Sequence, residues 1–294
     1  MASLWYTSAE RRDLGGLRAG WRFALFVLMV AGPLLGYGLA MSSAAGAGWA
    51  RALPHWVGDG VPLLWVGLVT LILARLEQRP FGDFGLPGRA AFRGEFWRGA
   101  LWGFVALSLL LGLIAASGGL RFAPLTASAG TVRSALEWAV AFVSVGLFEE
   151  FCFRGYALVT LASGLDFWPA AVGLSALFGA LHLGNSGESI LGALAAAGIG
   201  LFFCLTVRRT GNLWFAVGLH AAWDYSESFL FGVPDSGSTL PGSLMHPSFR
   251  GSHWITGGSV GPEGSVYVFL VIAALFVLFA RRHPAAQAAA APTP

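Results

Sequence analysis

Residues 148–154 read FEEFCFR and lie inside an apolar run from Ala135 to Ala162. Such a run is typical of a membrane-spanning helix, where a charged side chain near the centre costs about 2.5–3.5 kcal/mol. Two adjacent carboxylates and a guanidinium are therefore expensive in this place. Ionisable residues inside spans usually serve a function and have an internal partner. The stretch predicts a functional site at membrane depth.

Helical spacing separates the two carboxylates. Glu150 and Arg154 are four residues apart and can form an ion pair on one helix face. Glu149 points about 100° away from Glu150, toward neighbouring helices. Two interpretations stay open: the three charges form a structural network between helices, or Glu149 is available for chemistry while the other two support it.

Composition defines the class of protein. The chain has 294 residues, of which 56% are hydrophobic and 11% charged, whereas soluble domains carry about 25% charged residues. This predicts an all-α polytopic membrane protein. All 18 basic residues are Arg, which excludes lysine-based catalysis, and their scatter over the chain gives no nucleic-acid patch. The two cysteines support neither a disulfide framework nor a cysteine-based zinc site.

Eight apolar segments approach the length of about 20 residues that a membrane-spanning helix needs. We expect them near residues 22–41, 60–76, 98–117, 135–160, 167–185, 189–207, 212–232 and 264–281. This organisation predicts one transmembrane domain over 22–282, with its motif core at 135–232. It follows a short N-terminal segment, 1–21, and precedes a disordered tail, 283–294. A cleaved signal peptide over 1–45 is an alternative for the first segment.

The arginines of the loops predict the orientation, because cytoplasmic loops carry an excess of positive charge. One side of the eight-span topology collects Arg11, Arg12, Arg18, Arg22, Arg75, Arg79, Arg89, Arg93, Arg98, Arg208, Arg209, Arg281 and Arg282. The other side collects Arg51, Arg121, Arg133 and Arg250. We therefore expect both termini in the cytoplasm and the protein in a bacterial cytoplasmic membrane.

Two further spans carry ionisable residues. Phe178 and His182 are four apart in the fifth, and His220 and Asp224 are four apart in the seventh, so each pair shares one helix face. A single intramembrane histidine is often only a hydrogen-bonded packing residue. Together with Glu149, however, these groups cost least if they converge on one hydrated pocket. On straight helices Glu149 and His182 would be offset by about 10 Å, so the helices have to tilt.

A pocket of this composition suits peptide-bond hydrolysis. A carboxylate in a low-dielectric pocket can take a proton from water. Histidines can hold that water, bind a metal or donate to an oxyanion. Glu149, His182, His220 and Asp224 are also a candidate zinc set, but the HExxH spacing is missing, so spacing alone does not establish a metal.

The ordered motifs Glu149-Glu150-x-x-x-Arg154, Phe178-x-x-x-His182 and His220-x-x-x-Asp224 resemble the CPBP family. This family comprises the CAAX-protease, bacteriocin-processing and abortive-infection proteins and includes the type II prenyl-protein endopeptidases. The segment Arg79-Pro80…Gly85-Leu86 resembles the family's usual lead-in to the third span. The resemblance implies an intramembrane endopeptidase, commonly labelled metal-dependent, although a metal-free glutamate mechanism has also been argued for the family.

The resemblance also implies residue roles. Glu149 would activate the attacking water, with His182 positioning it. His220 and residue 224 would stabilise the oxyanion, and Glu150, Arg154 and Phe178 would support the site. Many members have Asn where this chain has Asp224. An ionised Asp would repel an oxyanion, so Asp224 would be protonated, orient His220 or bind a metal.

The expected partners are the lipid bilayer and a hydrophobic or membrane-anchored peptide or protein. Nothing in the sequence indicates a prenyl-group pocket. Two other classes of function stay open: a proton-coupled transporter, and a non-catalytic membrane scaffold or immunity-type protein of the same fold. Missing inverted repeats and missing broken helices in matching halves count against transport.

Overall fold

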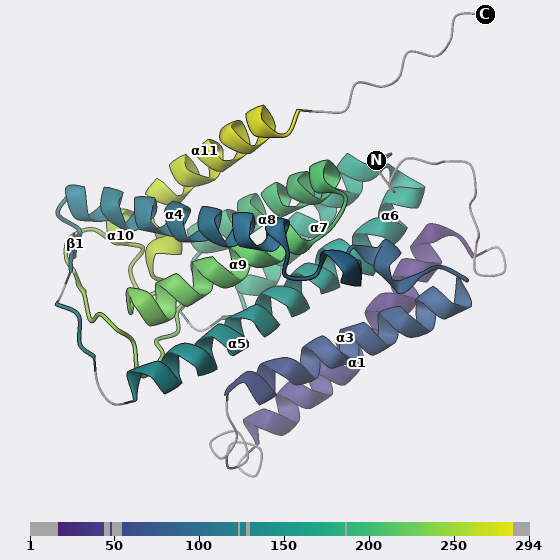
Figure 1. Ribbon diagram of the computed structural model, residues 1–294, viewed down its shortest axis with the longest axis horizontal. Coiled ribbons are helices and arrows are strands. Elements are labelled where there is room, and N and C mark those ends of the chain that lie inside the picture. Colours follow the sequence, from purple (N-terminus) through teal and green to yellow (C-terminus); the bar gives the residue numbers. More distant parts are fainter. Residues whose placement is uncertain are drawn as a thin grey trace, which may run out of the picture.

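The computed structural model describes residues 17–43, 48, 55–122, 124–127, 130–185 and 187–284. Most of the expected N-terminal segment and of the expected tail lie outside these residues. The described residues form a helical bundle (Figure 1), which confirms the mostly helical class.

The bundle contains long helices, short helical turns and one small strand pair. The longer helices are α1 (Ala19–Ser42), α3 (His55–Leu76), α4 (Gly94–Ala116), α5 (Thr131–Glu150), α6 (Ala157–Leu165), α7 (Phe167–His182), α8 (Ile190–Thr210), α9 (Trp214–Tyr225) and α11 (Tyr267–Arg282). The short elements are η1 (Phe81–Phe84), η2 (Gly88–Ala90), η3 (Phe151–Tyr156), η4 (Ser226–Leu230), α10 (His253–Thr256), η5 (Pro262–Gly264), β1 (Leu120–Arg121) and β2 (Ser248–Phe249). The strands β1 and β2 pair antiparallel, with Leu120 opposite Phe249.

Four of the described helices are long and apolar enough to cross a membrane: α1, α3 from Trp56 onward, α4 and α8. Helix α7 is apolar but shorter. These helices indicate an integral membrane protein, whereas the number of eight spans is not confirmed and stays a prediction. The expected orientation of the termini also stays a prediction.

Helix α9 lies in the middle of the bundle. It packs against α4, α5 and α8, while α1 and α3 lie side by side at one edge and α11 at the opposite edge (Figure 1). Nearly every side chain of α9 is buried. This helix carries His220 and Asp224, so its neighbours determine where those two side chains lie.

Glycines allow α4 and α9 to approach each other closely. A Cβ atom at Gly99 or Gly103 of α4 would collide with the carbonyl oxygens of Phe215 and Leu219. Conversely, a Cβ atom at Gly218 of α9 would collide with a carbonyl oxygen of α4. Small residues at such positions are typical of tightly packed membrane helices. Direct contact between the two helix backbones therefore sets the distance between α4 and α9.

The helix that carries FEEFCFR is interrupted, in contrast to the continuous span expected over 135–160. Helix α5 ends at Glu150, and the π-helix η3 connects it to α6. Gly155 has non-helical angles, φ −80° and ψ −118°. A Cβ atom there would lie 2.7 Å from the Phe151 ring, so the bend requires glycine. Such π turns are frequent at functional sites.

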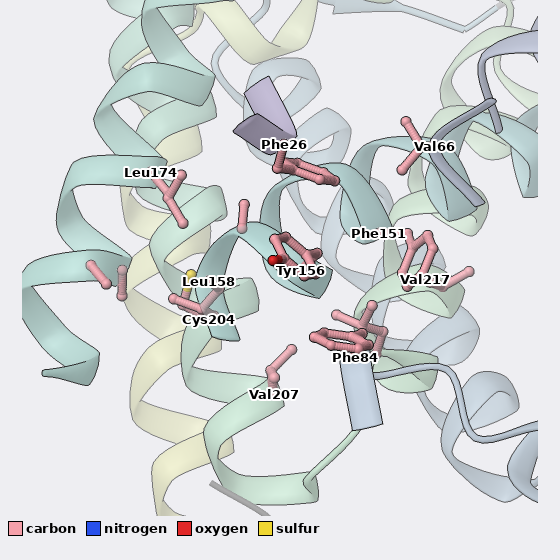
Figure 2. Packing of buried hydrophobic residues seen from close by; sticks show 14 of the residues in the cluster. Phe26, Val66, Phe84, Phe151, Tyr156, Leu158, Leu174, Cys204, Val207 and Val217 are labelled. Carbon is pink, nitrogen blue, oxygen red and sulfur yellow. The ribbon is translucent and has the colours of Figure 1, made fainter. Parts of the chain in front are cut away.

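A buried polar cluster, separate from the FEEFCFR charges, joins α1, the end of α3 and η3. Glu77 is fully buried, forms an ion pair with Arg22 at 3.2 Å and accepts a hydrogen bond from the Tyr156 hydroxyl. Phe26 and Phe84 pack against the Tyr156 ring, each with its ring centroid 5.1 Å away (Figure 2). From the sequence, Arg22 indicates only the orientation in the membrane, and no spacing pattern pairs it with Glu77.

The lead-in segment around Gly85 docks on the start of α9. The Leu213 amide donates to the Gly85 carbonyl at 2.8 Å, and the Trp214 indole donates to the Pro87 carbonyl at 3.3 Å. Gly85 has φ +99°, a left-handed conformation that favours glycine. The segment therefore anchors the beginning of the helix that carries His220.

We predict that Gly103→Ala destabilises the protein by about 1–3 kcal/mol, because the added methyl group has to displace backbone. In larger domains 1 kcal/mol corresponds to about 2–4 °C in the unfolding midpoint. The midpoint of the purified protein in detergent should fall accordingly. Gly112→Ala on the same helix is the matched control, since nothing lies within 4 Å of its added Cβ. Equal midpoints for the two variants would contradict the close packing.

Candidate active site

One cavity collects the four side chains for which the sequence predicts chemistry. Glu149 comes from the last turn of α5, His182 from the last turn of α7, and His220 and Asp224 from α9. All four line a cavity of about 180 Å³ between these helices and α8. On straight helices an axial offset is expected between Glu149 and His182. Both side chains nevertheless line the same cavity. The convergence is a finding of the structure, whereas the catalytic roles stay a prediction.

The Glu150 carboxylate is fully buried and is held from two sides. Arg154 Nη1 donates to its Oε1 atom at 3.1 Å, and His220 Nδ1 donates to the same atom at 3.0 Å. The first contact is the pairing that the spacing predicted. A buried carboxylate costs several kcal/mol unless such partners compensate it. Glu150 is thus a fixed anchor that connects α5 with α9.

Aromatic rings and a glycine hold the Arg154 guanidinium. Its Cζ atom lies 4.4 Å above the Phe178 ring and 5.6 Å from the Phe203 ring, within the range of cation–π attraction. A Cβ atom at Gly200 of α8 would collide with the guanidinium. Residues of α7 and α8 therefore surround the Arg154 guanidinium and fix its position.

Glu149 differs from its neighbour in sequence. Its side chain is 26% exposed, whereas that of Glu150 is 0% exposed. Its carboxylate lies 3.7 Å from His220 Nε2, which is longer than a hydrogen bond. The Glu149 carboxylate therefore faces the cavity and is free to engage a water molecule or a substrate.

His220 lies between three carboxylates. Because its Nδ1 atom donates to Glu150, its Nε2 atom faces the cavity, 3.7 Å from Glu149 and 3.5 Å from Asp224. The Phe203 ring stacks on the imidazole at 5.6 Å and 12°. Ring stacking and the Glu150 contact together fix the orientation of the imidazole.

His182 has a defined tautomer. Its Nδ1 atom lies 2.8 Å from the Phe178 carbonyl oxygen, and since a carbonyl only accepts, Nδ1 carries a proton. The Nε2 atom is then left for the cavity. The Phe178 ring, 4.5 Å from the imidazole, also lies under Arg154, so Phe178 connects both groups.

The predicted metal set does not form a compact ligand group. Two of its spacings suit one ion, since His220 Nε2 lies 3.7 Å from Glu149 and 3.5 Å from Asp224. Among the described His, Cys, Asp and Glu side chains, however, the one group of three with donor atoms within 4.8 Å of one another is Glu227, Asp235 and Glu263. A metal held by Glu149, His182, His220 and Asp224 therefore stays a prediction.

Further acidic residues, which the sequence did not predict as part of the site, lie around the same cavity. Glu188, Asp235 and Glu263 line it, and Glu227 is buried close by. Burial raises the pKa of Glu188. Burial and the neighbouring negative charges of Asp224 and Glu263 raise the pKa of Asp235 well above its ordinary value.

These omissions have different reasons. Glu227 follows Asp224 by three residues inside an expected span, so the rule that singled out Glu149 applied to it as well. Glu188 lies between two expected spans, where an acidic residue is ordinary and gives no signal of a site. It directly precedes the N-cap of α8, where Ser189 Oγ accepts from the Gly192 amide at 3.0 Å. No sequence signal brings Asp235 and Glu263 together.

Comparison with known proteins supports the resemblance. Residues 131–226 match the family model described as "Type II CAAX prenyl endopeptidase Rce1-like". The matched region begins with α5 and ends just after α9, so it contains Glu149, His182, His220 and Asp224. No curated protein and no solved structure matched the chain. The predicted similarity to the CPBP family is thereby confirmed, and at the family level the match supports a membrane protease.

We predict that Arg154→Met destabilises the protein by about 3–5 kcal/mol, because Glu150 then stays buried without its arginine. Unfolding in detergent measures the change. Adding Glu150→Gln to this variant should restore part of the loss, since the uncompensated charge disappears.

The matched control is Arg133→Met on α5. Arg133 also pairs with a glutamate four residues away, Glu137 at 2.8 Å, but this pair is exposed. Exposed pairs contribute little to stability, so the midpoint should barely move. A similar loss from both arginine variants would contradict a special role of the buried pair.

Proposed function

Since residues 131–226 carry an Rce1-like region, we propose that this protein is an intramembrane endopeptidase that hydrolyses a peptide bond in the cavity between α5, α7, α8 and α9. The substrate class is a hydrophobic or membrane-anchored peptide or protein. The observation that best supports this proposal is that two adjacent glutamates have different environments. Glu150 is locked by Arg154 and His220, whereas Glu149 faces the cavity.

Water activation is the role that we propose for Glu149 and His182. The Glu149 carboxylate takes one proton of a water molecule as general base. His182 carries its own proton on Nδ1, so its Nε2 lone pair can accept the second O–H of that water. The water oxygen is thereby aimed at the carbonyl carbon of the peptide bond.

The carbonyl oxygen becomes negative as the new C–O bond forms. We assign its stabilisation to His220, whose Nε2–H can donate to it. When the C–N bond breaks, Glu149 returns the proton to the leaving amine. His220 starts between carboxylates, and its Nδ1 contact with Glu150 stays in place throughout.

Asp224 fits the role of a positioning residue. Its Oδ2 atom lies 3.5 Å from His220 Nε2, one helical turn away on α9. We assign Asp224 one protonated state throughout the reaction. Its Oδ2 atom faces the Nε2–H group of His220 before substrate enters, and its own O–H adds a second donor for the oxyanion. A protonated Asp carries no negative charge, so it does not repel the oxyanion.

The experiment compares peptide cleavage by the wild type and by Glu149→Gln. The purified protein in liposomes is incubated with a library of quenched fluorescent hydrophobic peptides, and the released fragments are identified by mass spectrometry. We expect Glu149→Gln to lower the rate about 10²–10⁴-fold, the usual contribution of a general base. Its unfolding midpoint should remain close to that of the wild type, because the side chain has no tight internal partner.

Glu137→Gln is the matched control, because it makes the same chemical change on the same helix at a residue that does not line the cavity. It should cleave like the wild type. Full activity of Glu149→Gln would overturn the assignment of the base. Proton transport by the wild type without any cleavage would favour the transporter, and neither activity would favour a scaffold of the same fold.

A further inference from the structure

A second ionisable cluster lies beyond the four residues of the proposed reaction. It consists of Glu227 in η4, Asp235 shortly after it and Glu263 in η5. One carboxylate oxygen of each residue lies within 4.8 Å of the corresponding oxygens of the other two. Asp235 and Glu263 also line the catalytic cavity, so the cluster lies at its rim.

The carboxylate of Glu227 in this cluster is buried without a hydrogen-bond partner. It is 0% exposed, and neither of its carboxylate oxygens has a hydrogen-bond partner. The Trp223 indole N–H group lies near this carboxylate, but outside hydrogen-bonding geometry. A buried carboxylate without a partner is costly.

The other two carboxylates have neutral donors. Ser228 Oγ donates to Asp235 at 3.0 Å, and Ser236 donates to Glu263 through its amide at 3.3 Å and its hydroxyl at 2.8 Å. In the described part of the chain no arginine forms an ion pair with any of the three. Three carboxylates thus face one another without a positive charge between them.

We propose that Glu227, Asp235 and Glu263 bind a divalent cation, and that Ca²⁺ is the best fit. Three carboxylates without sulfur or imidazole ligands form a hard oxygen site, which Ca²⁺ and Mg²⁺ prefer. Oxygens around Ca²⁺ at about 2.3–2.6 Å can lie up to about 5 Å apart, compared with about 4.2 Å around Mg²⁺. The three oxygens lie within 4.8 Å of one another, so one ion can reach all of them. Mg²⁺ usually keeps several water ligands and binds through only one or two carboxylates, so three protein carboxylates favour Ca²⁺.

The cation would join three places in the chain. Glu227 belongs to the continuation of α9, and Asp235 and Glu263 lie near the two ends of the long segment 232–263. The ends of this segment already touch, since the Gly237 amide donates to the Val260 carbonyl at 2.9 Å. The bound ion would fasten the segment to the end of α9 and give the cavity a firm rim. This role does not depend on the proposed hydrolysis.

The test measures stability, so it can fail separately from the protease assay. The wild-type protein is freed of metal with a chelator, and its unfolding midpoint is followed while Ca²⁺ is added. We expect a saturable rise of several degrees, as for any ligand that binds the folded state alone. Elemental analysis should find one Ca²⁺ per chain, and Mg²⁺ should give a smaller shift.

Glu227→Gln and Asp235→Asn should abolish the calcium-dependent rise. Glu227→Gln should melt at or above the wild-type midpoint in chelator, because it removes an uncompensated charge. Asp235→Asn provides a second variant at a more exposed position if the first does not fold. Glu188→Gln, which changes a cavity acid outside the trio, is the matched control and should keep the rise.

Two results would overturn the proposal. One is a wild-type midpoint that does not respond to Ca²⁺. The other is a response that survives in both Glu227→Gln and Asp235→Asn, since the ion would then bind elsewhere. A larger shift with Mg²⁺ than with Ca²⁺ would overturn the choice of ion.

Discussion

The buried carboxylate of Glu150 is the constraint on which the rest of the site depends. It cannot stay ionised at this depth without compensation, and Arg154 and His220 supply that compensation through one oxygen atom. Satisfying this one charge therefore positions a guanidinium, an imidazole and two helices. The side chain of Glu149, one residue earlier, takes no part in this pairing and faces the cavity. One buried charge thus fixes the framework, and the neighbouring carboxylate stays accessible from the cavity.

The packing of the helices also fixes the positions of Arg154 and His220. Helix α9 is anchored at its start by the Gly85 segment and along its length by the glycines of α4. Helices α7 and α8 add the aromatic rings that cover Arg154 and His220. The imidazole of His220 is thus oriented from all sides before any substrate enters. Preorganisation of this kind lets a donor act on a developing charge without first having to reorganise.

Much of this could be predicted from the sequence, because charges inside apolar helices are rare and i,i+4 spacing is a reliable guide to shared faces. The Glu150–Arg154 pair follows from spacing alone, and the shared pocket follows from the cost of leaving Glu149, His182 and His220 apart. The π turn at η3 did not follow, because it depends on the fit between Gly155 and the ring of Phe151. The contact between Asp235 and Glu263 depends on how a long segment closes, for which no local pattern exists.

The contact between α4 and α9 has an evolutionary consequence. Because the Gly99, Gly103 and Gly218 faces press directly against carbonyl groups, no other amino acid can be tried there without moving a helix. The contact between α4 and α9 is therefore closed to gradual change. Side chains that line the cavity, such as Phe142 of α5 and Ile199 of α8, are not part of this contact and can change in size without moving the two helices. The framework of the bundle is thus fixed, whereas the shape of the cavity can vary.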